Sequence, residues 1–455
     1  MNILGAGQCG TLLATIMARH VASIDVYERG VDPREADGQA GRSINLALAA
    51  RGIRALQAAS VMPRIEPLLV PMRGRMIHDV DGSTEFQRYG QRNDEQIYSV
   101  SRGHLNQVLL NAAEERGNVN IHFQQEALGY DPSRCTAQFR DRNNDRDYEI
   151  AAAPLIAADG AGSVIRGSYS GSDLIGASRS LSQHGYKELA IPAGSDGKFQ
   201  LDPGALHIWP RGGFMLIALP NPGGDFTLTL FLANEGEQSF STLTDEQSVT
   251  AFFESHFADA AALIPDLCNA VINNPLGMLG TVRCRHWHDA GNMLLIGDAA
   301  HAVVPFHGQG MNLAFEDCVL FERMFAEIGE DWERVFENFE STQLTNANAI
   351  ADMALENYVE MRDTVRDPKY ALQKELAFEL ERRLPDRFIP RYSMVMFHAD
   401  IPYRVAKDRG EIQQHLLEQL TSDAEEIDQI DLDAAVATVV EQLEPVASGR
   451  LCPIH

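Results

Sequence analysis

The sequence is short of the features that mark exported, membrane-spanning and nucleic-acid-binding proteins. Its six cysteines are scattered without a C-x-x-C pair, which indicates neither a disulfide framework nor a thiolate metal site and suits a reducing cytoplasm. No apolar run approaches the roughly 20 residues that a bilayer-spanning helix needs, and the opening MNILGAG leaves no room for a signal peptide. We therefore expect a soluble, cytoplasmic protein without membrane contact.

Positive charge is scarce as well. The chain holds 38 Lys and Arg against 64 Asp and Glu, a formal net charge of −26, and no basic stripe offsets this balance. Such a surface repels a phosphate backbone, which argues against nucleic acid as a partner. The acidity says nothing more specific, because a heavily charged surface is most often a means of staying in solution.

The chain does have length and a large apolar fraction. Its 455 residues and 45% hydrophobic content predict two interlocked domains, or one large and one small domain. No internal repeat and no low-complexity linker divides them, so we expect the domains to be interleaved along the sequence.

The spacing of apolar residues predicts alternating strands and helices in the first third of the chain. A strand at 2–4, a helix and a strand at 24–30 form a β-turn-α-turn-β unit. Further surface helices are expected at 44–59 and 103–116. A run of strands then ends at Asp159-Gly160.

The pattern changes further along the chain. From 184 to 235 the period is two, with Pro and Gly turns between the runs, which predicts a separate sheet. A helix at 249–264 and a strand opening 294–301 follow. Two helical regions are expected after that, one at 309–383 that is nearly continuous and broken at Pro368 and Pro385, and an acidic one at 410–445.

A glycine-rich turn follows the first strand. Gly5, Gly7 and Gly10 have the GxGxxG spacing, in which one glycine makes the turn, one lets the backbone approach a pyrophosphate, and one lets helix and strand pack closely. Glu28, followed by Arg29, ends the second strand, where a carboxylate can accept hydrogen bonds from ribose hydroxyls. The charge of Glu28 would repel a 2′-phosphate, so this site suits FAD or NAD and disfavours NADP.

Two more elements of this kind lie downstream. Asp159-Gly160 lies in LIAADGAGSVIR, which alone reads equally well as an ordinary turn. In LLIGDAAHAVVPFHGQGMNLAFED, Asp298 can hold the hydroxyls of a ribityl chain, and the helix from Gly310, with Met311 and Asn312, points its N–H groups at a ring carbonyl or a pyrophosphate. A nicotinamide dinucleotide needs one such element, whereas three in this order match a flavin.

In this order the three motifs resemble those of the FAD-dependent aromatic hydroxylases, the single-component group A flavoprotein monooxygenases, over nearly the whole chain. Other segments are similar to the members that hydroxylate kynurenine: GRSINLALAARG, MRGRMIH, HGYKEL, LHIWPRGGFMLIALPN, VPFHGQGMN, ENYVEMR and RFIPRYSMV. Eukaryotic members carry a C-terminal membrane anchor that this sequence does not show, so the resemblance is to the bacterial form.

The resemblance implies an α/β fold in which a Rossmann-like, GR2-type FAD-binding domain is interleaved with a β-sheet substrate domain and followed by a helical C-terminal region. The FAD-binding domain is expected at 1–60, 101–180 and 281–365, the substrate domain at 61–100 and 181–280, and the helical region at 366–455.

The resemblance also implies a reaction. L-kynurenine, NADPH and dioxygen would give 3-hydroxykynurenine, in tryptophan degradation, through a hydroperoxide of a tightly but non-covalently bound FAD. NADPH would dock only transiently, since the sequence shows no second GxGxxG. Two other functions stay open: hydroxylation of a benzoate or phenol, and a flavin-binding redox protein without monooxygenation.

Polar side chains for an amino-acid substrate come from distant segments. Arg75 can pair bidentately with a carboxylate, and Tyr89 can add a phenolic donor; without the resemblance, an arginine in this context is more often solvated or structurally paired. By resemblance Arg75 and Tyr89, with Asn357 and Tyr392, hold the amino-acid end of the substrate.

The aromatic ring of the substrate needs an apolar slot. Met215, Ile217 and Leu219 share one face of a predicted strand, and Phe231 lies on the next strand. Periodicity alone makes these residues core; the resemblance makes them ring contacts, together with Pro305, Phe306, His307 and Met361. His307 could act as an acid or base, or simply as a packed hydrogen-bonding group.

Two remaining features are less specific. Arg42 and Arg102 flank the flavin segments and are candidates for pyrophosphate or ribose contacts, with surface ion pairs as the alternative. Cys284, His286 and His288 have a spacing that invites a metal, but no second ligand cluster lies near them in sequence, so we interpret them as core and turn residues and expect no metal.

Overall fold

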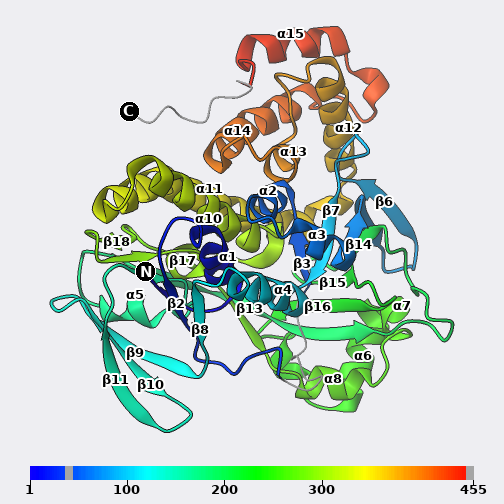
Figure 1. Ribbon diagram of the computed structural model, residues 1–455. Helices are drawn as coiled ribbons and strands as arrows, with labels where there is room; N and C mark the ends of the chain where they lie inside the picture. The colour runs from blue at the N-terminus through cyan, green and yellow to red at the C-terminus, as the bar shows by residue number, and fades with distance from the viewer. Residues whose placement is uncertain (36–44, 447–455) are drawn as a thin grey trace.

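The computed structural model describes residues 1–35 and 45–446, so Arg42, a predicted cofactor contact, lies outside the described residues. The predicted fold class is confirmed: a parallel sheet, a second and larger mixed sheet, and a helical C-terminal region (Figure 1).

The first sheet has six strands in the order β18-β19-β12-β1-β2-β8, and only β18 is antiparallel to its neighbour. The strands are short: β1 (Asn2–Leu4), β2 (Ile24–Tyr27), β8 (Val119–His122), β12 (Leu155–Ala157), β18 (His288–Asp289) and β19 (Met293–Leu295). The central ones are almost wholly buried, as expected for a parallel sheet covered on both faces. Their carboxyl ends meet at one edge, and each of the three predicted flavin motifs follows one of them.

The second sheet has seven strands in the order β17-β13-β16-β15-β14-β5-β6, in which only β14 and β5 run parallel. Its strands are β5 (Gly74–His78), β6 (Thr84–Arg88), β13 (Ser178–Ile191), β14 (Ala205–Pro210), β15 (Met215–Pro220), β16 (Phe226–Ala233) and β17 (Gly277–Arg283). The strands predicted from the period of two between 184 and 235 are confirmed as β13 to β16.

The alternation along β15 assigns the two faces of this sheet. Leu216 and Ala218 belong to a core beneath three short helices, α6 (Glu246–His256), α7 (Ala258–Ala261) and α8 (Leu267–Asn273). Met215 and Leu219 face the other way, into the main core of the molecule. This second face is the one that the sequence predicts for a substrate ring.

Two three-stranded sheets complete the β structure: β3 (Asn45–Leu48), β4 (Val70–Met72) and β7 (Ile97–Ser101), and the antiparallel β9 (Gln125–Asp131), β10 (Thr136–Asp141) and β11 (Arg146–Ala151) that projects at the lower left of Figure 1. The predicted helix over 44–59 is therefore wrong in its first part, because 45–48 is a strand paired with β7 and only α2 (Ala50–Ala58) is helical. A short apolar run has no period that separates the two states, and here the pairing with β7 decides.

Long helices follow the flavin motifs. α10 (Gly310–Ile328), α11 (Trp332–Arg362) and α12 (Pro368–Arg383) occupy the region predicted as nearly continuous helix. The break at Pro368 is confirmed, since this residue is the first of α12. A break at Gly329 was not predicted; Gly329 has a φ of +84°, and Asp331 caps α11 by accepting from the N–H of Arg334.

The remaining helices are mostly short. They are α1 (Gln8–Met17), α3 (Met62–Ile65), α4 (Arg102–Glu114), α5 (Val164–Ser168), α9 (Asp298–His301), α13 (Arg391–Met396), α14 (Tyr403–Leu420) and α15 (Leu432–Gln442), with the single-turn segments η1 (Glu66–Leu68), η2 (Phe240–Thr242), η3 (Pro305–His307), η4 (Thr364–Arg366) and η5 (Ile427–Gln429). Within the described ranges, no helix has both the length and the apolar character that crossing a membrane demands.

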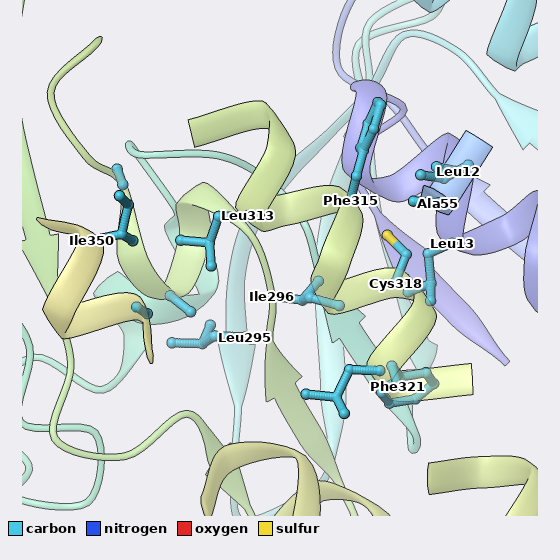
Figure 2. Close-up of a cluster of buried hydrophobic side chains, with 14 of the residues drawn as sticks. Leu12, Leu13, Ala55, Leu295, Ile296, Leu313, Phe315, Cys318, Phe321 and Ile350 are labelled. Atoms are coloured by element: carbon cyan, nitrogen blue, oxygen red, sulfur yellow. The ribbon is translucent and has the colours of Figure 1, made fainter. Parts of the chain in front are cut away.

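The main core fixes α10 between the sheet and its neighbouring helices. Leu12 of α1 and Ala55 of α2 lie beside Phe315 of α10, and Leu295 of β19 and Ile350 of α11 lie on the side of Leu313, all without solvent exposure (Figure 2). Burying each of the larger side chains stabilises the fold by about 1.5–3 kcal/mol. The first turn of α10, which carries Gly310 and Asn312, is thereby held rigidly at the carboxyl edge of the parallel sheet.

Candidate functional site

The three glycine-rich elements meet at the carboxyl ends of β1, β12 and β19. Gly5 has a φ of +99°, and a Cβ there would lie 2.5 Å from the carbonyl oxygen of Ala158. Gly297 has a φ of +59°, and its Cβ would lie 2.9 Å from the Sγ of Cys9. The first motif therefore packs against both of the others with no space for a side chain. Gly10 leaves no space either, since a Cβ there would meet the carbonyl oxygen of Gly5.

Gly7 is different, because nothing lies within 4 Å of the position of its Cβ. It precedes α1 with an ordinary φ of −70°, so neither strain nor packing in the protein requires a glycine. A ligand that lies close to the backbone would require a glycine at this position, because a side chain would block its approach. The open side of the turn at Gly7 is thus the natural place for a pyrophosphate.

Glu28, at the end of β2, is held against this turn. Its Oε2 accepts from the N–H of Ala6 at 2.9 Å and its Oε1 accepts from the N–H of Gly30 at 2.7 Å. Arg29 and Arg102 are exposed nearby, and the carbonyl of Arg102 accepts from the Nε2 of Gln8 at 3.2 Å. The structure thus brings Glu28 and Arg102 to the glycine turn.

The second and third motifs each contribute one carboxylate. The Oδ2 of Asp159 accepts from the N–H of Val164 at 2.8 Å, whereas its Oδ1 is buried and has no hydrogen-bond partner within the described part of the chain. Burial raises the pKa of Asp159. An unsatisfied buried oxygen is costly and calls for a donor from outside the protein. Asp298, directly after Gly297, is exposed and can accept from a hydroxyl.

A buried carboxylate beneath the third motif fixes its shape. Asp317 of α10 accepts from the N–H of Gly297 at 3.1 Å, from the Nε2 of His301 at 2.7 Å and from the Nε2 of Gln343 at 2.9 Å. Burial lowers the pKa of His301, but the charge of Asp317, its hydrogen bond to the ring and the charge of Asp298 together raise it, so that the net shift is upward. The turn that presents Asp298 is therefore anchored from below.

Asn312 connects the first turn of α10 to the segment that precedes α2. Its Oδ1 accepts from the N–H of Ala49 at 2.9 Å, and its Nδ2 donates to the carbonyls of Ala47 at 2.8 Å and Gly308 at 2.9 Å. In this arrangement Asn312 positions the backbone around Gly310 and Met311, whose N–H groups begin a helix of 19 residues.

The parallel sheet, the glycine turn with its open face, and the unsatisfied Asp159 oxygen fit FAD. Gly5, Gly7, Gly10 and Glu28 would hold its adenosine and pyrophosphate part, and Asp159, Asp298 and the start of α10 would hold the rest.

A cleft begins beside this cradle. It is lined by five of the predicted substrate residues, which come from five different elements or loops: Arg75, Tyr89, His307, Asn357 and Tyr392. His307 precedes Gly310 by only three residues. The predicted flavin segment therefore forms one wall of the cleft.

Charges of both signs meet in the cleft. The Nη1 of Arg75 donates to the Oε1 of Glu360 at 3.1 Å, and the hydroxyl of Tyr370 donates to the same oxygen at 2.8 Å. Burial raises the pKa of Glu360, but the charge of Arg75, the hydrogen bonds from Tyr370 and Arg75, and the charge of Arg391 together hold the pKa of the carboxyl below its usual range. Glu360 is therefore ionised at neutral pH, and Arg75 keeps its other donors for a ligand.

Two tyrosines stack beside the guanidinium. The rings of Tyr89 and Tyr392 are 5.2 Å apart and nearly parallel, at 15°, and the Cζ of Arg75 lies 5.1 Å from the ring of Tyr392 and 5.8 Å from that of Tyr89. Burial raises the pKa of both phenols, so they are neutral donors. Arg75 is thus restrained by aromatic contacts on one side and Glu360 on the other.

Sequence reasoning missed Glu360, Tyr370 and Lys374, which line the same cleft. A signal for Glu360 was present: it follows Asn357 by three residues on a helix, so the two side chains share a face. Tyr370 and Lys374 lie on α12, four residues apart, where local pattern gave no indication of a site.

The predicted ring contacts occupy another position. Met215, Leu219, Phe231, Phe306 and Met361 are buried in the main core, and none of them lines the cleft as the described residues outline it. Pro305 is exposed and Ile217 is half-buried. The buried residues support the cleft wall from behind. Phe231 packs edge-on to Phe306 at 5.0 Å between ring centroids, and Asn357 donates to the carbonyl of Phe306 at 2.7 Å.

His307 forms the part of the wall nearest the flavin segment. Its ring stacks on Tyr392 at 5.6 Å and 14°, and its Nδ1 is buried without a partner among the described residues. Burial lowers its pKa to about 4. His307 is therefore a neutral hydrogen-bonding group at physiological pH and would be a weak general base.

Cys284, His286 and His288 do not form a metal site within the described ranges. His286 and His288 both contact the carboxylate of Glu340 through Nδ1, at 2.9 Å and 2.7 Å, and Trp287 between them is buried. No cluster of three potential ligands in the described ranges could hold a metal ion.

The fold and the glycine-rich cradle together indicate a flavin-binding protein with a polar cleft beside the third motif. Comparisons with known proteins narrow this class. A family model described as an FAD binding domain matches residues 1–353. The chain is 46% identical over 449 residues to the kynurenine 3-monooxygenase of Stenotrophomonas maltophilia (strain K279a), covering 99% of this chain and 98% of that protein. It is 45% identical over 447 residues to the kynurenine 3-monooxygenase of Xanthomonas axonopodis pv. citri (strain 306), covering 98% and 97%.

A solved structure supports the fold independently. The tetrameric form of 2-methyl-3-hydroxypyridine-5-carboxylic acid oxygenase superposes with a TM-score of 0.64 at 18% identity, covering 81% of this chain and 93% of that chain. The chain belongs to the FAD-dependent monooxygenases and, within them, to the family of the kynurenine 3-monooxygenases.

Proposed function

We propose that the protein hydroxylates L-kynurenine at the 3-position, using bound FAD and consuming NADPH and dioxygen. The observation that carries the proposal is the Arg75–Glu360 pair in the cleft of a chain from this family. An α-amino acid presents one carboxylate and one ammonium, and the pair offers one group of each opposite sign. Arg75 is buried and Glu360 is half-buried, so bulk water screens the two charges only in part.

The cleft residues would divide the substrate between them. The carboxylate takes the free donors of Arg75 and the hydroxyl of Tyr89, and the ammonium lies against Glu360. The aryl ketone and ring then extend past Asn357 toward His307, which borders the flavin segment. Holding the ring in one orientation supplies the proximity that such a reaction needs.

The bound flavin would supply the activation of dioxygen. In this proposal the protein's own contribution is to orient the ring and to keep water out. The stacked Tyr89 and Tyr392, and Phe306 stacked on Tyr358 at 3.8 Å between ring centroids, are suited to that task. The 3-position is ortho to the aniline nitrogen, which already activates the ring. A strong protein base is therefore unnecessary, and a neutral His307 is consistent with that.

NADPH is part of this proposal as the reductant. The charge of Glu28 disfavours a 2′-phosphate in the glycine cradle, so we infer that NADPH docks elsewhere on the surface and only transiently.

The proposal is tested by turnover of purified protein. We expect a yellow protein whose NADPH oxidation L-kynurenine accelerates, with 3-hydroxykynurenine as the product by chromatography. Hydroxylation of a benzoate or phenol in a small substrate panel, but not of L-kynurenine, would favour the first alternative. Peroxide in proportion to NADPH with every aromatic compound tested would favour a redox protein without monooxygenation.

A further inference from the structure

A second cationic side chain lines the substrate cleft. Lys374 lies on α12, on the same helix face as Tyr370 and Phe378, and its Nζ is 5.9 Å from the centroid of the Phe378 ring. None of the hydrogen bonds or ion pairs formed within the described ranges engages its ammonium. A largely buried cation without a partner is costly, so the side chain calls for an explanation.

The charges around Lys374 come from several elements. Arg75 faces it from β5, Glu360 from α11 and Glu85 from β6, while Tyr370 lies one turn away on its own helix. Arg391 also lines the cleft, but it is paired with Glu356 at 2.6 Å. Glu360 is already bound to Arg75 and Tyr370. Within the cleft, the carboxylate of Glu360 therefore faces two cations, Arg75 and Lys374.

Two like charges in one poorly solvated cleft repel each other. Burial, followed by the positive charge of Arg75, lowers the pKa of Lys374 to about 8. An anion that bound between the two cations would remove this repulsion and satisfy the ammonium. Glu360 cannot take the place of this anion, because a carboxylate bound to Lys374 would no longer pair with the ammonium of the substrate.

We infer that Lys374 is a specificity-determining residue that holds the substrate carboxylate together with Arg75. The inference rests on the proposed function and names a residue that completes its anion site. It makes the cleft selective for substrates with a carboxylate at the end remote from the ring, whether or not they carry an α-amine. Binding of the carboxylate keeps Lys374 protonated, so binding is accompanied by proton uptake when the pH lies above about 8.

The test compares Lys374→Met and Lys374→Arg with the native holoenzyme. Two ligands are titrated by calorimetry between pH 7 and pH 9.5: L-kynurenine, and 4-(2-aminophenyl)-4-oxobutanoate, which keeps the carboxylate and the ring but has no α-amine that titrates. For native protein we expect the affinity for the des-amino ligand to fall as the pH rises through 8–9. Lys374→Met should bind it roughly 5- to 20-fold more weakly at pH 7 and show no such fall, and Lys374→Arg should stay tight throughout, since arginine remains charged.

Glu375→Gln is the matched control, because Glu375 is adjacent on α12 but exposed and outside the cleft. It should reproduce the native affinity and pH profile. Native protein at pH 8.5 should also show proton uptake when the titration is repeated in buffers of different ionisation enthalpy.

The outcomes separate the two proposals. If native holoenzyme binds neither ligand, the proposed function fails. If it binds both and Lys374→Met binds them equally well, or retains the native pH profile, the assignment of Lys374 is wrong while the proposed function stands.

Discussion

The glycine-rich cradle and the polar cleft are built from different kinds of group. The cradle is mostly backbone: turns at Gly5 and Gly297 that pack against their neighbours, and helix N-termini at the ends of adjacent parallel strands. The cleft is mostly side chains, carried to one place by β5, η3, α11, α12 and α13. A backbone site needs glycines at fixed spacing, whereas a side-chain site needs only that distant elements meet. The two should therefore fail differently when they are mutated.

The largest change in stability should distinguish alanine substitutions at two glycines of the same turn. Gly5→Ala places a Cβ against the Ala158 carbonyl at a φ of +99°, and should lower the free energy of unfolding by roughly 3 kcal/mol as well as abolish FAD binding. Gly7→Ala meets nothing in the protein, so it should leave the stability of the apoprotein unchanged and still lose FAD. Urea unfolding of apoprotein with FAD titration checks both. Equal stability of the two variants would contradict the packing described for Gly5.

The next effect concerns a buried titratable side chain of the cleft. The folded pKa of His307, about 4, lies below its unfolded value of about 6.5, so its contribution is fully present above pH 6.5 and is lost as the pH falls through 4. The loss should be about 3 kcal/mol. We expect His307→Asn to show a correspondingly smaller decrease in unfolding free energy between pH 7.5 and pH 4. An identical decrease in both proteins would show that His307 is accessible to protons in the folded state.

A single carboxylate of the cradle should matter somewhat less. Asp298→Ala removes an acceptor for flavin hydroxyls and should weaken FAD binding by roughly 1.5–3 kcal/mol, about 10- to 100-fold. Asp173→Ala is the control, because its side chain is 99% exposed and pairs with Arg285 far along the chain. Fluorescence titration of apoprotein gives both dissociation constants. Native FAD affinity in Asp298→Ala would remove this residue from the cradle.

The smallest effects resolve the two charges of the cleft. Arg75→Lys should weaken both L-kynurenine and its des-amino analogue by about 1–3 kcal/mol, because the fork geometry is lost. Glu360→Gln should weaken L-kynurenine by about 1 kcal/mol and leave the des-amino analogue unaffected or more tightly bound. Calorimetry with the holoenzyme measures the four constants. A Glu360→Gln variant that weakens both ligands equally would mean that this carboxylate only supports Arg75.

The same contrast explains what could be predicted from the sequence. The glycine turn, Glu28 and the two Asp motifs are local patterns, and the structure brings all of them to one sheet edge. The strand at 45–48 was missed because its partner β7 lies some fifty residues away, and pairing decides its state.

In the cleft, Arg75 and Tyr392 were found only through the resemblance, since nothing local marks them. Glu360 shares a helix face with Asn357, so a local signal for it was present and overlooked. Lys374 lines the cleft only because distant elements meet there, and no local pattern marks it. The residues predicted as ring contacts, such as Met215 and Phe231, are one layer behind the cleft. The alternation of side chains along a strand correctly predicted which face of the sheet they occupy. It cannot distinguish residues that line a site from core residues that lie behind it.

The most direct test measures how NADPH oxidation is coupled to hydroxylation. Purified holoenzyme, NADPH and L-kynurenine are mixed in air, and 3-hydroxykynurenine and hydrogen peroxide are quantified in the same sample. We predict close to one hydroxylated product per NADPH, falling toward peroxide alone in Arg75→Lys. Peroxide in proportion to NADPH from the native protein, with no hydroxylated product, would rule out the proposed hydroxylation.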